Sequence, residues 1–342
     1  MDKDSAFEVE LIVFGTHLSK CHGFTVSQIY SDGFKIGAEI DSMPDGDSPE
    51  DISTAIGKTI INFTSFWKAS EYDLVFSLGD RYEMFAACVS SIPFNINLAH
   101  IHGGEMTLGA IDEIFRTSLT IMSKFHFTSA EIYKQRVIAI KNSDQNVFNV
   151  GALSIDMLNS MELMDKQEFL DSFKIDLNIP TILVTFHPET IDYQMNETFS
   201  LELVEALKVL ESRYQVVITM PNADTMGNIV RKHLNNYIDS SKNAIGIESF
   251  GSKGYLTCMK YSSFMLGNTS SGFIEASYFP KPVINIGNRQ SGRILTPNIV
   301  SCGIQKDEIL NAAEKIQFLK LPEFIDTYGR RNTSDKIISV FS

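Results

Sequence analysis

The sequence has 342 residues and a formal net charge of −13, because 42 acidic residues outnumber 29 lysines and arginines. At roughly 100–200 residues per domain this length favours two domains, and a hydrophobic fraction of 44% excludes a largely disordered chain. The acidity argues against a nucleic-acid partner. No apolar run reaches the roughly 18–20 residues of a membrane span, and the N-terminal residues do not resemble a signal peptide.

In the first half of the chain, short apolar runs alternate with amphipathic stretches. Strands are predicted at 11–14, 73–79, 96–101, 125–129 and 147–150, and helices at 52–67, 82–91, 111–124 and 132–141. Continuous apolar strands that alternate with helices predict a doubly wound parallel sheet. About ten mostly polar or acidic residues precede the first strand. They are either a frayed terminus or a sign that the first βα unit is absent, and the fold prediction adopts the second reading.

In the second half the same rhythm restarts after a polar stretch at 154–177. Strands are predicted at 181–186, 215–220, 244–247, 264–266 and 282–286, and helices at 201–212, 224–237, 254–261 and 272–278. We therefore expect a GT-B type of fold with two Rossmann-like domains, 1–155 and 156–325, that face a cleft, and a C-terminal helix at 326–342. Sheets of this kind bind ligands at the carboxyl ends of their strands.

The four cysteines of the chain are spread over its length. They show no spacing typical of a metal site and read as buried thiols in a reducing compartment: Cys21, Cys88, Cys258 and Cys302. We therefore expect a cytoplasmic protein.

Polar residues follow two predicted strands of the first domain. Asp80 and Arg81 come after the strand at 73–79, where a carboxylate points into the mouth of a cleft, although Asp is also a common helix cap. His102 and Glu105 follow the next strand, and Asp112 lies where a helix begins. Grouped carboxylates are what proton abstraction beside a sugar ring needs, one as base and another as acid. A polar loop with a capped helix is the alternative.

In the second domain, candidate anion-binding groups follow the strands. His187 comes after the strand at 181–186, and a loop at 267–272 opens the predicted helix that carries Glu275. Small hydroxyl residues and glycine at a helix N-terminus suit a diphosphate, and here they are Ser270, Ser271 and Gly272. Ser249 and Tyr255 are candidates for an edge on which a base stacks, although an aromatic residue at such a place is more often part of the core. Arg289 and Arg293 are candidates for cationic donors.

Six motifs taken together resemble a known family. They are GDR at 79–81, HIHGGE at 100–105, AIDE at 110–113, TFHPET at 185–190, GNTSSGFIEA at 267–276 and GNRQSGR at 287–293. Their ordered set is similar to the hydrolysing UDP-N-acetylglucosamine 2-epimerases, which supply N-acetylmannosamine for sialic acid synthesis. A sister group acts on UDP-2,4-diacetamido-2,4,6-trideoxyglucose for legionaminic acid.

The resemblance implies a reaction without metal or cofactor. In this family the C2 proton is abstracted while UDP leaves C1, and water then adds to the 2-acetamidoglucal with inverted configuration. It also implies a homo-dimer or tetramer. Asp80, the HIHGGE segment and Asp112 would surround the sugar. The diphosphate would lie on His187, Ser270, Ser271 and Gly272, the ribose on Glu275 and the uracil on Tyr255.

Three departures from the family pattern stand out. Members usually begin with a strand and a TGTRADYG-like loop, and this chain begins after that point. His102 stands where several members carry a glutamate, as HIEGGE, and Glu105 takes part of that role. Thr117 stands where the family usually has histidine, and threonine does not titrate near neutral pH. The alternatives are a non-hydrolysing epimerase, a glycosyltransferase and a catalytically silent UDP-sugar-binding protein.

Overall fold

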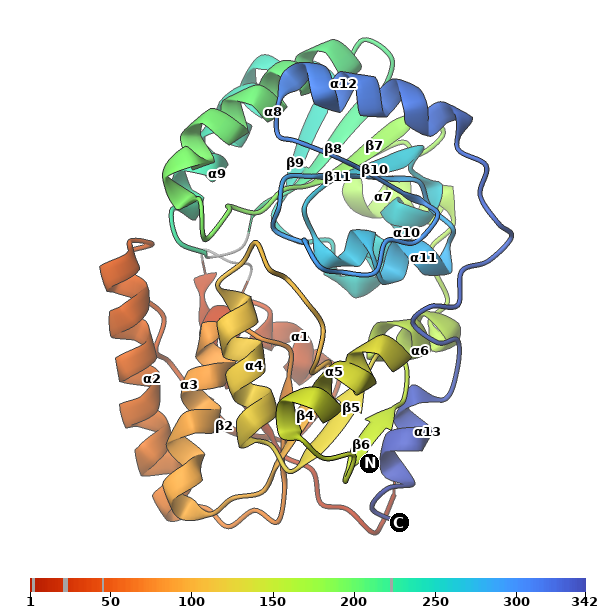
Figure 1. Ribbon diagram of the computed structural model, residues 1–342. Coiled ribbons are helices and arrows are strands. Elements are labelled where there is room, and N and C mark those ends of the chain that lie inside the picture. Colours follow the sequence, from red (N-terminus) through yellow and green to blue (C-terminus); the bar gives the residue numbers. More distant parts are fainter. Residues whose placement is uncertain (2–3, 21–23, 45, 222–223) are drawn as a thin grey trace. The chain divides into compact units, whose positions relative to one another are not determined.

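The computed structural model describes residues 1, 4–20, 24–44, 46–221 and 224–342. The chain divides into two units, each of which contains distant segments of the sequence (Figure 1). Unit 1 comprises Met1–Glu105, Ile111–Leu153 and Arg331–Ser342, and unit 2 comprises Met106–Ala110 and Ser154–Arg330. The chain thus leaves unit 1 for five residues directly after the HIHGGE motif.

Unit 1 contains two parallel sheets. The smaller sheet pairs β1 (Leu11–Phe14) with β2 (Ile36–Ile40), and the larger has the order β3-β4-β5-β6. The strands of the larger sheet are β3 (Val75–Leu78), β4 (Leu98–Ile101), β5 (Phe125–Thr128) and β6 (Val147–Asn149). Their carboxyl ends lie at one edge because all of these pairs are parallel.

The helices of unit 1 follow its strands in the chain. They are α1 (Val26–Ser31), α2 (Pro49–Ala69), α3 (Tyr82–Ser91), α4 (Asp112–Met122), α5 (Glu131–Lys141) and, from the C-terminal segment, α13 (Thr333–Ile338). Helix α2 begins at a capping box, in which the Ser48 hydroxyl accepts from the Asp51 N–H and the Asp51 carboxylate accepts from the Ser48 N–H. Its residues Phe63 and Trp67 form a core cluster that packs against both β1 and β3.

Unit 2 contains one parallel sheet with the order β9-β8-β7-β10-β11-β12. Its strands are β7 (Thr181–Thr185), β8 (Gln215–Thr219), β9 (Ala244–Ile247), β10 (Phe264–Gly267), β11 (Val283–Ile286) and β12 (Ile299–Cys302). Its helices are α6 (Leu153–Ser160), whose first residue belongs to unit 1, α7 (Lys166–Phe173), α8 (Asn196–Leu210), α9 (Gly227–Ser240), α10 (Gly251–Tyr261), α11 (Glu275–Tyr278) and α12 (Lys306–Lys315). All residues of β7 are buried, as expected for a central strand.

The strand order of unit 2 is that of a doubly wound sheet, 3-2-1-4-5-6 in chain order. The strands of unit 1 can be matched to those of unit 2. The pair β2-β1 then takes the places of β9-β8, and the sheet β3-β4-β5-β6 starts at the place of β10. Within the described residues, no strand occupies the position that β7 holds in unit 2. The predicted α/β class with two Rossmann-like sheets is therefore confirmed.

Every strand predicted from a continuous apolar run is present, within two residues at each end. The sequence analysis missed α1, β2, β12 and α12, whereas α13 forms part of the C-terminal helix predicted at 326–342. Strand β2 alternates between half-buried and exposed residues and contains Gly37, so it lacks a continuous apolar run. The thiols of Cys88 and Cys258 are buried as predicted, whereas Cys302 is partly exposed at the end of an edge strand, and Cys21 lies outside the described residues.

Candidate active site

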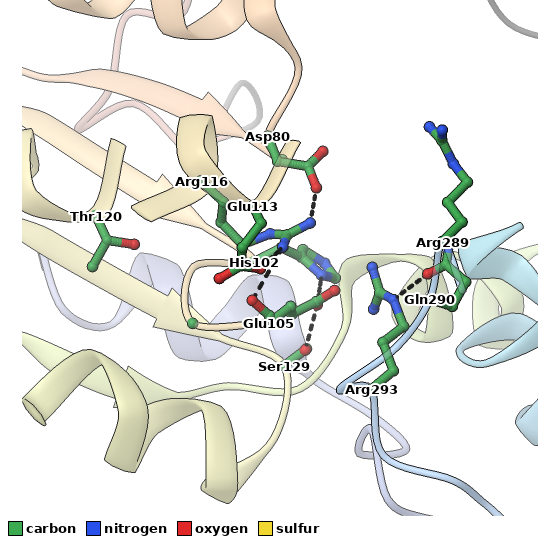
Figure 2. A network of polar contacts seen from close by, with 12 residues as sticks. Asp80, His102, Glu105, Glu113, Arg116, Thr120, Ser129, Arg289, Gln290 and Arg293 are labelled. Carbon is green, nitrogen blue, oxygen red and sulfur yellow. Dashed lines mark hydrogen bonds and ion pairs between the residues drawn. The ribbon is translucent and has the colours of Figure 1, made fainter. Parts of the chain in front are cut away.

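Asp80 lies two residues after the end of β3 and faces a buried arginine from another element. Arg116, on α4, is 2% exposed and forms an ion pair with the Asp80 carboxylate, as Figure 2 shows. Gly79, between the strand and Asp80, has a φ of +83°, which favours glycine at this turn. The predicted strand-end aspartate is therefore held by a buried cation rather than by the N-terminus of α3.

Arg116 also holds the segment that follows β4. Its Nη1 lies 3.1 Å from the backbone oxygen of Glu105 and 3.0 Å from Oε2 of Glu113. Arg136, on α5, donates to the same Glu105 oxygen at 2.7 Å and pairs with the Glu113 carboxylate. Two guanidinium groups thus fix one carbonyl and two carboxylates, and their charges offset the repulsion between the acids.

The HIHGGE segment turns sharply after β4. His102 has a φ of +66° and Gly104 one of +79°. A Cβ atom at Gly104 would lie 2.3 Å from the backbone oxygen of Tyr133, so α5 packs too closely for any side chain there. The turn brings His102 Nδ1 within 2.6 Å of Glu105 Oε1, and Ser129, after β5, donates to the same oxygen at 2.6 Å (Figure 2).

The remaining predicted residues of unit 1 lie beside this network. Asp112 is the first residue of α4, next to Glu113, and is partly buried. The guanidinium of Arg81 pairs with the carboxylate of Glu83 at 3.1 and 3.2 Å. The structure therefore brings Asp80, His102 and Glu105 together through Arg116, and it places Arg81 on a separate acid.

Two buried imidazoles of the sheet do not belong to this network. His100 donates from Nε2 to the Gly79 carbonyl (2.8 Å), its Nδ1 lies 3.2 Å from Thr120 Oγ1, and burial lowers its pKa to about 4. His126 lies opposite it on β5, and burial lowers its pKa to about 3. Both rings are therefore uncharged near neutral pH, and they serve the sheet rather than the charged network.

Arg116, Arg136, Glu113 and Ser129 are the network members that the sequence analysis did not select as site residues. Arg136 has the sequence signature of a helical surface residue, and only the packing of α5 brings it to the HIHGGE turn. Ser129 carried a usable signal, because it is the last residue of a predicted strand whose neighbour ends in the HIHGGE motif. The rule that strand ends carry ligand-binding groups, applied to every strand, would have found it.

In unit 2 the loops after β7 and β10 are joined by side-chain hydrogen bonds. The Asn268 side chain accepts from the His187 N–H at 2.7 Å and donates to the His187 carbonyl at 2.8 Å. The Tyr255 hydroxyl lies 2.6 Å from Ser271 Oγ and 3.3 Å from Thr185 Oγ1. Since β7 and β10 are the neighbours at which the strand order reverses, these loops lie at the switch point where doubly wound sheets bind ligands.

The predicted helix at 272–278 is wrong in its extent. A 3-10 turn spans Ser270–Gly272, and α11 begins at Glu275 and has four residues. Thr269 caps the turn through its hydroxyl, and Pro280 follows closely, so a longer helix is not formed. The argument that a helix N-terminus at Gly272 would attract a diphosphate therefore does not hold. The hydroxyl groups of the loop are what remains for an anion, because the N–H groups of Ser271 and Gly272 are bonded to Thr269.

The arginines after β11 bind the protein's own groups. Arg289 is buried and donates to the Pro188 carbonyl at 2.6 Å and to Asp224 Oδ2 at 2.8 Å. Arg293 donates to Gln290 Oε1 at 2.6 Å. Arg289 therefore stiffens the loop beside His187. Ser249 is exposed and accepts from the Gly251 N–H at 3.1 Å.

The five residues Met106–Ala110 pack against the loop after β11. The Leu108 N–H donates to the Ser291 carbonyl at 2.8 Å. A Cβ at Gly109 would lie 1.9 Å from the Asn288 carbonyl oxygen, so glycine is the residue that permits this approach. The chain between Glu105 and Asp112 is therefore anchored in unit 2.

Among the residues that the structure describes, no three His, Cys, Asp or Glu side chains are grouped as metal ligands. Nor does any described helix combine the length and apolarity that crossing a membrane requires.

Parallel sheets with carboxylates at the strand ends of one unit and hydroxyl groups at the switch point of the other define a protein of the GT-B fold class. The whole chain, residues 1–342, matches the family described as UDP-N-acetylglucosamine 2-epimerase. The protein belongs to this family, as the six motifs predicted.

Relatives and solved structures agree with this assignment. The chain is 33% identical over 318 residues to the GDP/UDP-N,N'-diacetylbacillosamine 2-epimerase (hydrolyzing) of Campylobacter jejuni, covering 93% of this chain and 82% of that protein. It is 34% identical over 322 residues to the polysialic acid biosynthesis protein P7 of Escherichia coli, covering 92% and 81%. The crystal structure of UDP-GlcNAc 2-epimerase from Neisseria meningitidis bound to UDP-GlcNAc shares the fold, with a TM-score of 0.82, 19% identity and coverage of 99% and 93%.

Proposed function

We propose that the protein is a hydrolysing 2-epimerase that converts a UDP-linked 2-acetamido sugar into UDP and the free C2 epimer. The observation that carries this proposal is the buried Arg116, which pairs with the carboxylates of Asp80 and Glu113 and holds the backbone carbonyl of Glu105. Removal of a weakly acidic C2 proton needs a base, and rehydration needs an acid. A set of acids held by two arginines supplies candidates for both.

The proposed reaction has two steps. A carboxylate takes the proton from C2, the C1–O bond to the nucleotide breaks with its electron pair leaving on UDP, and a 2-acetamidoglucal forms. Water then adds across the double bond, with its hydroxyl on C1 and a proton on C2 from the opposite face. We assign the sugar side to unit 1, with Asp80, Arg81, His102, Glu105 and Asp112.

We assign the nucleotide side to unit 2. The diphosphate would contact the loops after β7 and β10, since their hydroxyl and backbone groups lie at the switch point of the sheet. The residues proposed for the nucleotide are His187, Ser249, Tyr255, Ser270, Ser271, Gly272, Glu275 and Arg289. Arg289 would act through the loop that it holds, because its guanidinium is already bonded to Asp224.

Two substrates fit the relatives. The name of the Campylobacter relative favours a 2,4-diacetamido sugar, and the description of the matching family favours UDP-N-acetylglucosamine. On the same family grounds we propose a cytoplasmic homo-dimer or tetramer.

The deciding experiment incubates the protein with each UDP-sugar in deuterated water and follows products by NMR. We expect free sugar, UDP and deuterium at C2. An intact UDP-sugar epimerised at C2 would instead identify a non-hydrolysing enzyme. Calorimetric UDP binding without turnover of either substrate would identify a silent binding protein.

A further inference from the structure

The protein itself occupies both ring nitrogens of His102. Nδ1 lies 2.6 Å from Glu105 Oε1, and Nε2 lies 3.4 Å from the backbone nitrogen of Leu153. Because a backbone N–H only donates, Nε2 accepts and carries no proton. The proton of the neutral ring is therefore on Nδ1 and is donated to Glu105.

Glu105 is buried, and both its carboxylate and its backbone carbonyl accept hydrogen bonds. Its side chain is 4% exposed, and its Oε1 also accepts from the Ser129 hydroxyl at 2.6 Å. Its carbonyl oxygen accepts from Arg116 and Arg136. With the backbone fixed by two arginines, the orientation of the carboxylate depends on what His102 and Ser129 donate.

The backbone of His102 is strained in a way that serves this contact. Its φ of +66° lies in the left-handed region, which a non-glycine residue adopts only at a cost in free energy. The His102 N–H remains bonded to the Phe127 carbonyl at 2.9 Å, so the strand pairing is kept while the side chain turns toward Glu105. An outlier at a candidate site is a reason to look for a function of the side chain.

The two partners of the ring lie at the points where the chain leaves unit 1. Glu105 is the last residue before Met106–Ala110, and Leu153 is the last before Ser154–Arg330. Leu153 is also the first residue of α6, where a backbone N–H has no partner within the helix. The imidazole therefore contacts both the Glu105 carboxylate and the first residue of α6.

Resting on the function proposed above, we propose that His102 is a positioning residue. Its neutral imidazole is a bridge that orients the Glu105 carboxylate and fixes the chain at Leu153, and proton transfer at C2 belongs to the carboxylates.

The variants His102→Asn and His102→Asp test this role. Both side chains have the same shape, and both tolerate a positive φ. The Asn amide nitrogen reaches the position of Nδ1 and can donate to Glu105, whereas an ionised Asp cannot donate and repels the carboxylate. His102→Ala removes the contact altogether. Fluorescence of the single tryptophan, Trp67 in unit 1, checks that each variant is folded.

If His102 is a positioning residue, His102→Asn keeps kcat within about fivefold of the parent. In His102→Asp and His102→Ala, kcat falls about 10²-fold, which is the effect of a misplaced group. KM changes less than threefold in all three variants. Proton transfer by His102 predicts the opposite order. The titratable Asp would then retain more activity than Asn, and Asn would lose about 10²- to 10⁴-fold. That order would overturn the proposal.

The tautomer provides a readout that does not depend on turnover. In ¹⁵N-edited NMR of the parent at neutral pH, with His102→Asn to assign the signal, we expect a proton on Nδ1 and none on Nε2. A ring protonated on Nε2 would overturn the bridge. If the parent releases no UDP from either sugar, the proposed function fails, and the tautomer still decides the bridge.

Discussion

The guanidinium of Arg116 is 2% exposed, and the carboxylate of Asp80 with which it pairs is 25% exposed. The pair therefore joins the interior of unit 1 to the surface at which β3 ends. Arg116 simultaneously contacts the Glu105 carbonyl and the Glu113 carboxylate. One buried cation thus sets the relative positions of groups from β3, from the turn after β4 and from α4.

Removing this cation should destabilise unit 1. We expect Arg116→Met to lower the free energy of unfolding by about 3–5 kcal/mol, because it leaves partly buried acids without their counter-charge. Arg116→Lys keeps the charge but lacks the planar fork, so it should recover only part of the loss. Urea unfolding followed by Trp67 fluorescence measures both.

Lys35→Met is the matched control in unit 1. Lys35 pairs with Glu8 at 3.1 Å and with Glu10 at 2.7 Å, but its own side chain is 56% exposed. Losing such a contact should cost less than about 1 kcal/mol. If Arg116→Met unfolds at the same urea concentration as this control, the network does not hold unit 1 together.

Asp112 should matter for turnover and not for the nucleotide. We expect Asp112→Asn to abolish release of UDP, because the amide cannot exchange a proton with the sugar, while the affinity for UDP stays within a few-fold. Asn keeps the shape and remains compatible with the first turn of α4, so folding should be preserved. Calorimetry with UDP and the NMR product assay separate the two effects. Full activity of this variant would remove Asp112 from the proposed site.

The sequence predicted the central strands of unit 2 because they are buried on both faces. β7 and β10 are continuous apolar runs bounded by polar residues, and this pattern survives without knowledge of any partner strand. β2 and β12 escaped prediction because half-exposed strands carry a mixed pattern. Their assignment depends on neighbours that are distant in the sequence.

The same distinction applies to the site. Asp80, His102 and Glu105 could be selected because each follows a strand, and strand ends meet at one edge of a parallel sheet. Arg136 could not, since its role depends on how α5 packs against Gly104. The break between the 3-10 turn and α11 also depends on local capping, which hydrophobic periodicity does not report. The sequence therefore indicated the acids but not the arginines that hold them.

Gly109 should be indispensable for the path of the chain between Glu105 and Asp112. In Gly109→Ala the new Cβ would lie 1.9 Å from the Asn288 carbonyl oxygen, a backbone atom that cannot turn away. We expect the segment to shift and turnover to fall at least tenfold, since small displacements of reacting groups have large effects. Steady-state kinetics and a thermal unfolding midpoint measure the outcome.

Gly57→Ala is the matched substitution. Gly57 lies within α2, and a Cβ there would meet nothing within 4 Å. It should stabilise the helix by about 0.5–1 kcal/mol and leave turnover unchanged. Equal activity in the two variants would mean that the close approach of Gly109 to Asn288 does not affect turnover.

The buried histidines should make unit 1 sensitive to acid. His126 is 1% exposed, neither of its ring nitrogens has a hydrogen-bond partner within the described residues, and its pKa is lowered to about 3. In the unfolded chain its pKa returns to about 6.5. Between these values the unfolded state binds a proton that the folded state does not, so the free energy of unfolding falls as the pH falls below about 6.5. His100, with a pKa of about 4, adds to this effect.

His126→Leu should make this dependence shallower, by up to about 1.4 kcal/mol per pH unit, and should leave stability at pH 7.5 unchanged or higher, because the variant buries no unbonded imidazole. Urea unfolding at several pH values, followed by Trp67 fluorescence, gives the slope. His233→Leu, in unit 2, should not alter the slope that Trp67 reports. A slope that is the same in the parent and in His126→Leu would show that His126 is not neutral by burial, and the acid sensitivity of unit 1 would then have to come from other groups.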